Sequence, residues 1–183
     1  MNDVACMPYL DDNGMYSTMM IPRGEINEDV IRVYKSGQCL AFAQAMAELT
    51  DMPVVWAFSS TQGNHSPEWA AEWDGRTVAE WRAHHQSKTG TPGNWALGFI
   101  HAMVEAPNGY LVDISSCGTP QKWHDYWNDY GLGPIAFLKA SAEDMENLQY
   151  ESTKAVAPQV IELAHGYAEI RERNAKRAAQ DAR

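Results

Sequence analysis

The sequence predicts an α+β fold with a mostly antiparallel sheet. Capped, helix-forming segments come before residue 51. Short β-branched and aromatic runs cover residues 54–58, 97–105, 110–114 and 134–138, and further helix-forming segments follow. Strands that are grouped, rather than alternating regularly with helices, favour antiparallel pairing. With 183 residues and 45% hydrophobic side chains, the chain is expected to form one domain over residues 1–183.

The first quarter of the chain contains two candidate helix starts. Residues 1–24 hold two prolines and two glycines and are expected to be irregular or short-stranded. Asn27, followed by two acids, predicts an N-cap and a short helix through about Tyr34. Ser36 is the next candidate cap, for a helix of residues 37–50 with a core-facing apolar stripe.

Residues 59–96 are a Trp-rich insertion between predicted strands. Four of the seven tryptophans lie here, among several glycines and prolines. A structureless connection of this length is uncommon in a compact domain, so some local helix or hairpin is expected, with Arg76–Gln86 as the helical piece. We expect the tryptophans to form a small satellite core, although loops of this size near an active site also carry specificity.

The second half of the chain contains the strongest hairpin pattern. Residues 97–105 and 110–114 are predicted strands joined through Pro107-Asn108-Gly109. Thr119-Pro120 predicts the cap and first turn of a helix over residues 121–130. A strand over 134–138, a short helix opening at 141–144 and a charged C-terminal helix over about 158–183 complete the expected fold.

The formal net charge of −10 narrows the possible partners. Direct binding to nucleic-acid phosphates is not expected, because it needs a surplus of Lys and Arg, and five of the 14 Lys and Arg residues are gathered in residues 171–183. The acidic balance suits a soluble protein, or one that engages a basic partner. Three widely spaced cysteines predict no disulfide framework, the N-terminus lacks a secretory signal, and no run approaches the roughly 20 apolar residues of a membrane span. We therefore expect a cytoplasmic protein that engages no membrane.

Cys39 is the candidate nucleophile. It stands at the front of a helix-forming run, where backbone N–H groups and the positive end of the helix dipole favour a thiolate. His101 and Asp113 lie on the two predicted strands of the hairpin. A thiol on a helix tip, with His and Asp on paired strands, is a set of parts for nucleophilic catalysis. His101 would be the base, and Asp113 would accept the other ring N–H and fix the tautomer.

The register of the hairpin decides whether His101 and Asp113 meet. A strict two-residue Asn108-Gly109 turn would separate them by roughly 10 Å along the strands. A three- or five-residue loop centred on Pro107 would place them opposite each other, with Cβ atoms roughly 4.5–5.5 Å apart. Because proline cannot donate to a ladder, Pro107 favours the second register.

Gln38 and Gly37 complete the candidate site. The oxyanion would be held by the Cys39 backbone N–H, the helix N-terminus and the Gln38 side chain, while Gly37 permits close approach of a substrate backbone. Plainer interpretations stay open: a buried core cysteine, a core histidine bonded to a carbonyl, and a turn or cap acid. An unpaired acid within the apolar run of residues 111–114 would, however, be costly.

Other combinations of reactive side chains are weaker. Cys117 and His124 are seven residues apart, but Cys117 heads no helix. A zinc site from Cys6, Cys39, Cys117 and a histidine would lack any Cys-x-x-Cys pair. His84-His85 is expected on the surface. We therefore expect no metal and no other cofactor.

Three segments resemble the papain-like cysteine enzymes: Tyr34-Lys35-Ser36-Gly37-Gln38-Cys39-Leu40-Ala41-Phe42-Ala43, then Gly98-Phe99-Ile100-His101-Ala102, then Asn108-Gly109-Tyr110-Leu111-Val112-Asp113-Ile114. The chain looks like uncharacterised small bacterial and phage proteins with this Gly-Gln-Cys helix start. The same Cys–His–Asp order occurs in transglutaminase-like enzymes and arylamine acetyltransferases. Papain itself has a glutamine several residues before its cysteine, whereas Gln38 here is adjacent.

The resemblance implies a papain-like fold, with the cysteine helix packed on the sheet that carries His101 and Asp113. It also implies thiol chemistry on an acyl group: peptide or isopeptide hydrolysis, deamidation or acyl transfer. The substrate would be a protein, a peptide or another acyl compound. The alternative is a non-catalytic acidic binding module or inhibitor on the same fold. The charge of −10 and the tryptophans of residues 59–96 suggest this alternative.

Overall fold

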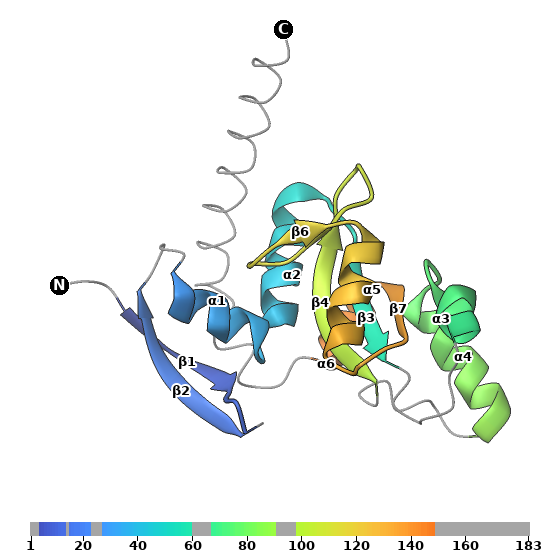
Figure 1. Cartoon of the computed structure of the whole chain (residues 1–183), viewed down its shortest axis with the longest axis horizontal. Coiled ribbons are helices and arrows are strands. Elements are labelled where there is room, and N and C mark those ends of the chain that lie inside the picture. The colour runs from blue at the N-terminus through green and yellow to red at the C-terminus, as the bar shows by residue number, and fades with distance from the viewer. Residues whose placement is uncertain (1–3, 14, 23–26, 60–66, 91–97, 149–183) are drawn as a thin grey trace, which may run out of the picture. The chain divides into compact units, whose positions relative to one another are not determined.

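Two strands and two helices come first along the chain; one strand, two helices, three strands, a helix, a strand and a final helix follow in the described residues (Figure 1). The computed structural model describes residues 4–13, 15–22, 27–59, 67–90 and 98–148. The chain divides into two compact units, Met1–Asp51 with Tyr150–Arg183, and Met52–Gln149. The helix expected over about 158–183 and Trp95 lie outside the described residues, and the single domain over 1–183 stays a prediction.

The first unit begins with a hairpin of two seven-residue strands, β1 (Val4–Leu10) and β2 (Tyr16–Pro22), paired antiparallel with Met7 opposite Met19. Of the two alternatives expected for residues 1–24, irregular or short-stranded, strands apply to most of this segment. Period-two burial explains the strands, because Met7 and Tyr9 are buried while Cys6 is exposed. A two-stranded sheet also leaves an outer edge on each strand, where a proline needs no ladder partner.

Two helices follow the hairpin in the first unit. α1 (Glu28–Lys35) begins as predicted, since Oδ1 of Asn27 accepts the backbone N–H of Val30 at 2.9 Å. α2 (Cys39–Thr50) begins two residues later than expected. Ser36 is not its cap: Ser36 ends α1 by donating its backbone N–H to the carbonyl of Arg32. Gly37 then has φ +120°, which is incompatible with a helix and favours glycine.

The second unit is built on a five-stranded antiparallel sheet in the order β6-β5-β4-β3-β7. Its strands are β3 (Val54–Ser59), β4 (Phe99–Glu105), β5 (Leu111–Val112), β6 (Cys117–Gly118) and β7 (Ile135–Ala140). The predicted α+β class with a mostly antiparallel sheet is confirmed. The strand expected over 110–114 is shorter than predicted, and β6 was not predicted.

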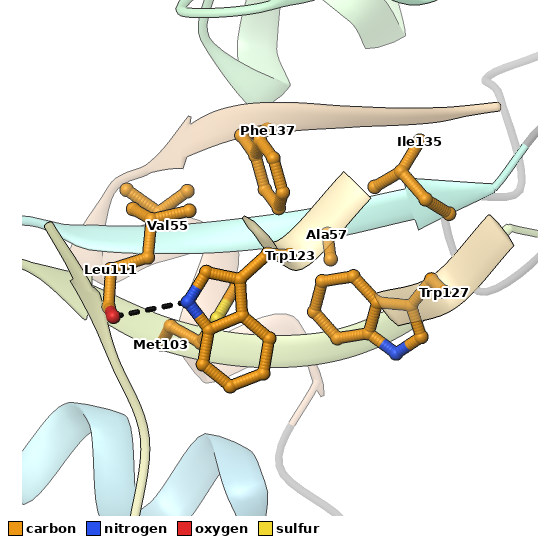
Figure 2. Packing of buried hydrophobic residues seen from close by; sticks show 8 residues of the cluster. All are labelled: Val55, Ala57, Met103, Leu111, Trp123, Trp127, Ile135 and Phe137. Carbon is orange, nitrogen blue, oxygen red and sulfur yellow. Dashed lines mark hydrogen bonds between the residues drawn. The ribbon is translucent and has the colours of Figure 1, made fainter. Parts of the chain in front are cut away.

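One face of this sheet is covered by α5 (Pro120–Asp129), which Thr119 caps through its hydroxyl oxygen, as predicted. Figure 2 shows Trp123 and Trp127 of this helix over the sheet. Beneath them lie the inward-facing side chains of four strands: Val55, Ala57, Met103, Leu111, Ile135 and Phe137. The indole Nε1 of Trp123 donates to the backbone carbonyl of Leu111 at 3.1 Å, so the polar atom of this buried ring has a partner.

Segments from the Trp-rich insertion lie against the outer strand β7. α3 (Pro67–Trp73) was not foreseen, whereas α4 (Val78–Thr89) overlaps the predicted 76–86 and starts with a capping box at Thr77. Between them, residues 74–77 bond to the edge of β7 through Phe137 and Lys139. Trp73 is buried and Trp81 lies 5.2 Å from Phe58, ring centre to ring centre, so both pack within this unit.

α6 (Ala142–Leu148) ends the described chain, and Ser141 caps it by accepting from the backbone N–H of Asp144. Among all the helices in the described ranges, none combines the length and apolar character that a bilayer crossing would require.

Candidate functional site

His101 lies on β4, directly opposite Ala57 of β3. It lies two residues from Met103 along the strand, so the side chains of His101 and Met103 point to the same face of the sheet, the face that α5 covers. The small side chain of Ala57 leaves room beside the imidazole. The ring centre of His101 lies 6.0 Å from that of Trp127, and the histidine is only 5% exposed. The β4 strand thus holds the imidazole inside the apolar layer between sheet and helix.

Asp113 follows β5 and holds a tight turn into β6. Its Oδ1 accepts the backbone N–H groups of Ser115 and Ser116, at 2.7 and 2.8 Å, and the Ser115 hydroxyl at 2.8 Å. This is an Asx-type turn, in which an aspartate side chain organises the two residues after it. The other carboxylate oxygen, Oδ2, lies 3.0 Å from Nε2 of His101. One carboxylate therefore fixes a turn and contacts an imidazole at the same time.

The predicted register of this hairpin is wrong, although the two side chains meet. The loop has three residues, but it is centred on Asn108: Val104 lies opposite Val112, and Ala106 donates to the carbonyl of Tyr110. Continuing this ladder would put Asp113 beside Met103, two residues from His101. Contact is made along the diagonal, which is within reach of long side chains. Gly109 closes the loop with φ +76°, the left-handed conformation that such three-residue loops require.

The charge of Asp113 fixes the chemistry of the imidazole. Burial by itself raises the pKa of this carboxyl, but the hydrogen bond and charge of His101, with the hydrogen bonds from Ser115, outweigh it and lower the pKa overall. A carboxylate that is ionised at neutral pH can only accept hydrogen bonds. Nε2 of His101 must then carry a hydrogen, and in the neutral imidazole the basic lone pair is on Nδ1.

The three residues of the predicted thiol site lie at the start of α2, in the first unit. Cys39 is the first residue of the helix, is buried, and forms no disulfide. The N–H groups of a first helical turn have no partner within the helix, and they favour negative charge at that end. Gln38 occupies the N-cap position and is buried, and its side chain makes no capping hydrogen bond. Gly37 supplies the positive φ that separates α2 from α1.

The structure thus brings His101 and Asp113 together in the second unit, and places Cys39, Gln38 and Gly37 together in the first. The joint role of Cys39 with the His101–Asp113 pair stays a prediction.

The weaker combinations can also be located. Cys6 and Cys117 are exposed, and Nε2 of His124 lies 3.8 Å from Oδ2 of Asp74. Within the described ranges, no group of three or more His, Cys, Asp or Glu side chains is arranged to hold a metal ion.

Sequence reasoning missed three residues that contribute to the pair. Ser115 and Ser116 hold the carboxylate of Asp113, and the pattern Asp-x-Ser-Ser is a recognisable signal for an Asx turn. Trp127 flanks the imidazole of His101, and its i, i+4 spacing from Trp123 marks both as the inner face of an amphipathic helix.

Comparisons of the chain with protein-family models, with curated protein sequences and with solved structures found no match.

Proposed function

We propose that the protein is a cysteine-dependent hydrolase or acyltransferase with a papain-like arrangement of Cys39, His101 and Asp113. The observation that carries the proposal is the buried hydrogen bond between His101 and Asp113, 3.0 Å long. A buried histidine with only a structural role can be satisfied by one neutral hydrogen-bond partner. Here it has an ionised carboxylate that is itself held by three further hydrogen bonds, which is how an orienting acid is supported.

Each residue has one task in the proposed reaction. Nδ1 of His101 takes the thiol proton of Cys39, and the sulfur attacks a carbonyl carbon of the substrate. The oxyanion that forms is stabilised by the Cys39 backbone N–H, the N-terminus of α2 and the side chain of Gln38. The carbon–nitrogen bond then breaks, and the imidazolium gives its proton to the departing amine. Water or another amine attacks the thioester, loses its proton to His101 and releases the thiol.

Alkylation of the three cysteines tests this proposal within one molecule. Cys6 and Cys117 are exposed and serve as internal reference thiols, whereas Cys39 is 8% exposed. An inert, buried Cys39 should react with iodoacetamide more slowly than both. An activated Cys39 should react faster than both at pH 6, because the thiolate is the reactive form and an activated thiol would be largely ionised there. Peptide mapping by mass spectrometry gives the three rates separately.

His101→Ala and Asp113→Asn are expected to slow the alkylation of Cys39 at pH 6 by about tenfold or more, since each removes stabilisation of the ion pair. The rates at Cys6 and Cys117 should stay unchanged in both variants. If wild-type Cys39 reacts no faster than the exposed cysteines, or if neither variant alters its rate, the catalytic assignment is wrong.

A second candidate function is a non-catalytic acidic binding module, which the net charge of −10 favours. The two functions differ in their dependence on the thiol. Cys39→Ser would abolish the activity of an enzyme of this kind, and would leave the action of a binding module intact.

A further inference from the structure

A groove of about 450 Å³ lies in the second unit, between α3 and α5 at the start of β7. Its volume is in the range of small-ligand sites, roughly 300–1,000 Å³. Pro67 and Ala71 of α3 and Pro134 before β7 give it apolar walls. Asp74, Gln121, His124 and Asn128 supply its polar groups, the last three from one face of α5. The groove thus joins an aliphatic surface to a cluster of polar side chains.

The polar groups are held in place from outside the groove. Oδ1 of Asp74 accepts the backbone N–H of Phe137 at 2.8 Å, and the His124 ring stands edge-on to the Phe137 ring, 4.7 Å between centres. Gln121 donates its side-chain N–H to Asp125 at 2.8 Å, which leaves its carbonyl oxygen as the accepting atom. These supports fix a carboxylate and an imidazole on the lining before any ligand arrives.

The space between the side chains of Asp74 and His124 can hold one hydrogen-bond donor that contacts both of them. Oδ2 of Asp74 lies 3.8 Å from Nε2 of His124, too far for a direct hydrogen bond. A nitrogen placed between them can lie at about 2.9 Å from both, a normal hydrogen-bond length. With its hydrogen on Nδ1, the imidazole accepts at Nε2, and the Gln121 carbonyl oxygen is a third acceptor.

We propose that this groove binds an arginine side chain presented by a polypeptide partner. Among the residues that line the groove in the described part of the chain there is an acid but no Lys or Arg, so an anion is disfavoured. The aliphatic walls suit the methylene stem of a basic side chain, whose charged head then reaches the acceptors. A guanidinium presents five donors spread over a planar fork, whereas an ammonium presents three on a single nitrogen, so the guanidinium is better suited to acceptors that lie apart from one another.

The charge of the whole chain supports a basic partner. At a net −10, the protein attracts positively charged segments at long range, and the groove gives that attraction a specific point of contact. The inference does not involve the thiol of Cys39, so its failure would leave the proposed enzyme untouched.

The test is an NMR titration of the full chain with a blocked alanine–arginine–alanine tripeptide. The side-chain amide of Gln121 and the backbone amides of residues 121–128 report on the groove. We expect saturable shifts with a Kd on the order of 1 mM. The same peptide with citrulline, which has the shape of arginine but no charge, should bind at least about tenfold more weakly.

Two variants and one matched control locate the contact. Asp74→Asn keeps an oxygen for the Phe137 N–H and should weaken binding by about tenfold. Ala71→Trp keeps every charge and should weaken binding by filling the groove. Asp129→Asn removes one exposed acid of α5 that does not line the groove, and should change Kd by less than about twofold.

Three outcomes would overturn the assignment: no saturable shift with the arginine peptide, equal binding of the citrulline peptide, or an equal loss in Asp129→Asn and Asp74→Asn. The last would mean that only general charge attraction was measured. Amide shift dispersion in each variant confirms that it is folded.

Discussion

Replacing Asp113 by asparagine separates the two contacts of its carboxylate. The asparagine keeps a carbonyl oxygen for the N–H groups of Ser115 and Ser116, but it turns an NH₂ group toward Nε2 of His101. One buried, charge-assisted hydrogen bond is lost, which corresponds to about 1.5–3 kcal/mol of unfolding free energy. Asp113→Ala loses the bonds to the turn as well and leaves the imidazole without its acid, so we expect about 3–5 kcal/mol.

Urea unfolding followed by tryptophan fluorescence measures both losses, because Trp123 and Trp127 lie in the same unit as the pair. The pH dependence adds a second check. Since the pKa of Asp113 is lowered in the folded state, its carboxylate stabilises the fold above the ordinary aspartate pKa of about 4, and this contribution is lost as the pH falls through the lowered pKa. The difference between wild type and Asp113→Asn should therefore be full at pH 7 and shrink below about pH 4.

Two results would refute this reasoning. If Asp113→Asn and Asp113→Ala destabilise equally, the bonds of Oδ1 to the turn contribute nothing measurable. If Asp113→Asn costs less than about 0.5 kcal/mol at pH 7, the contact with His101 is not the charge-assisted hydrogen bond that its geometry indicates.

Two further substitutions test the framework around the pair. Trp123→Phe removes the donor to the Leu111 carbonyl and part of a buried ring, and should lower the unfolding free energy by about 1–3 kcal/mol in the same urea assay, whereas an unchanged midpoint would show that the bond is not formed. Gly109→Ala meets no neighbouring atom but must adopt φ +76°, so it should cost about 1–2 kcal/mol from backbone strain alone, and Gly109→Asn, which tolerates that conformation better, should cost less.

Local signals predicted the fold well where they act over a few residues. The caps at Asn27 and Thr119 begin their helices as expected, because a side-chain oxygen within three residues of an N–H needs no distant partner. The start of α2 was misplaced, since Ser36 satisfies the end of one helix instead of the beginning of the next. A single polar residue between two helices carries no sign of which end it caps.

The contact between His101 and Asp113 was foreseen, but for an inexact reason. The sequence suggested a direct cross-strand pair, whereas the ladder ends at Val112 and the Asx turn carries Asp113 onto the diagonal. The position of such a turn depends on where the strand ends. The apolar run continues to Ile114, so the sequence pattern did not show that the strand ends at Val112. The groove beside Asp74 was not foreseen at all, because its lining comes from segments about 50 residues apart, whose meeting no periodicity reveals.

The covering of β7 by residues 74–77 has a consequence for the behaviour of the protein at high concentration. Gly75 and Arg76 occupy hydrogen-bonding groups of Phe137 and Lys139 that would otherwise face outward along a six-residue strand. At the opposite margin of the sheet, β6 offers only two residues. Unpaired edge strands are where a second chain can add a strand through backbone hydrogen bonds. Because one edge of this sheet is covered and the other is short, the sheet offers few sites for edge-to-edge aggregation.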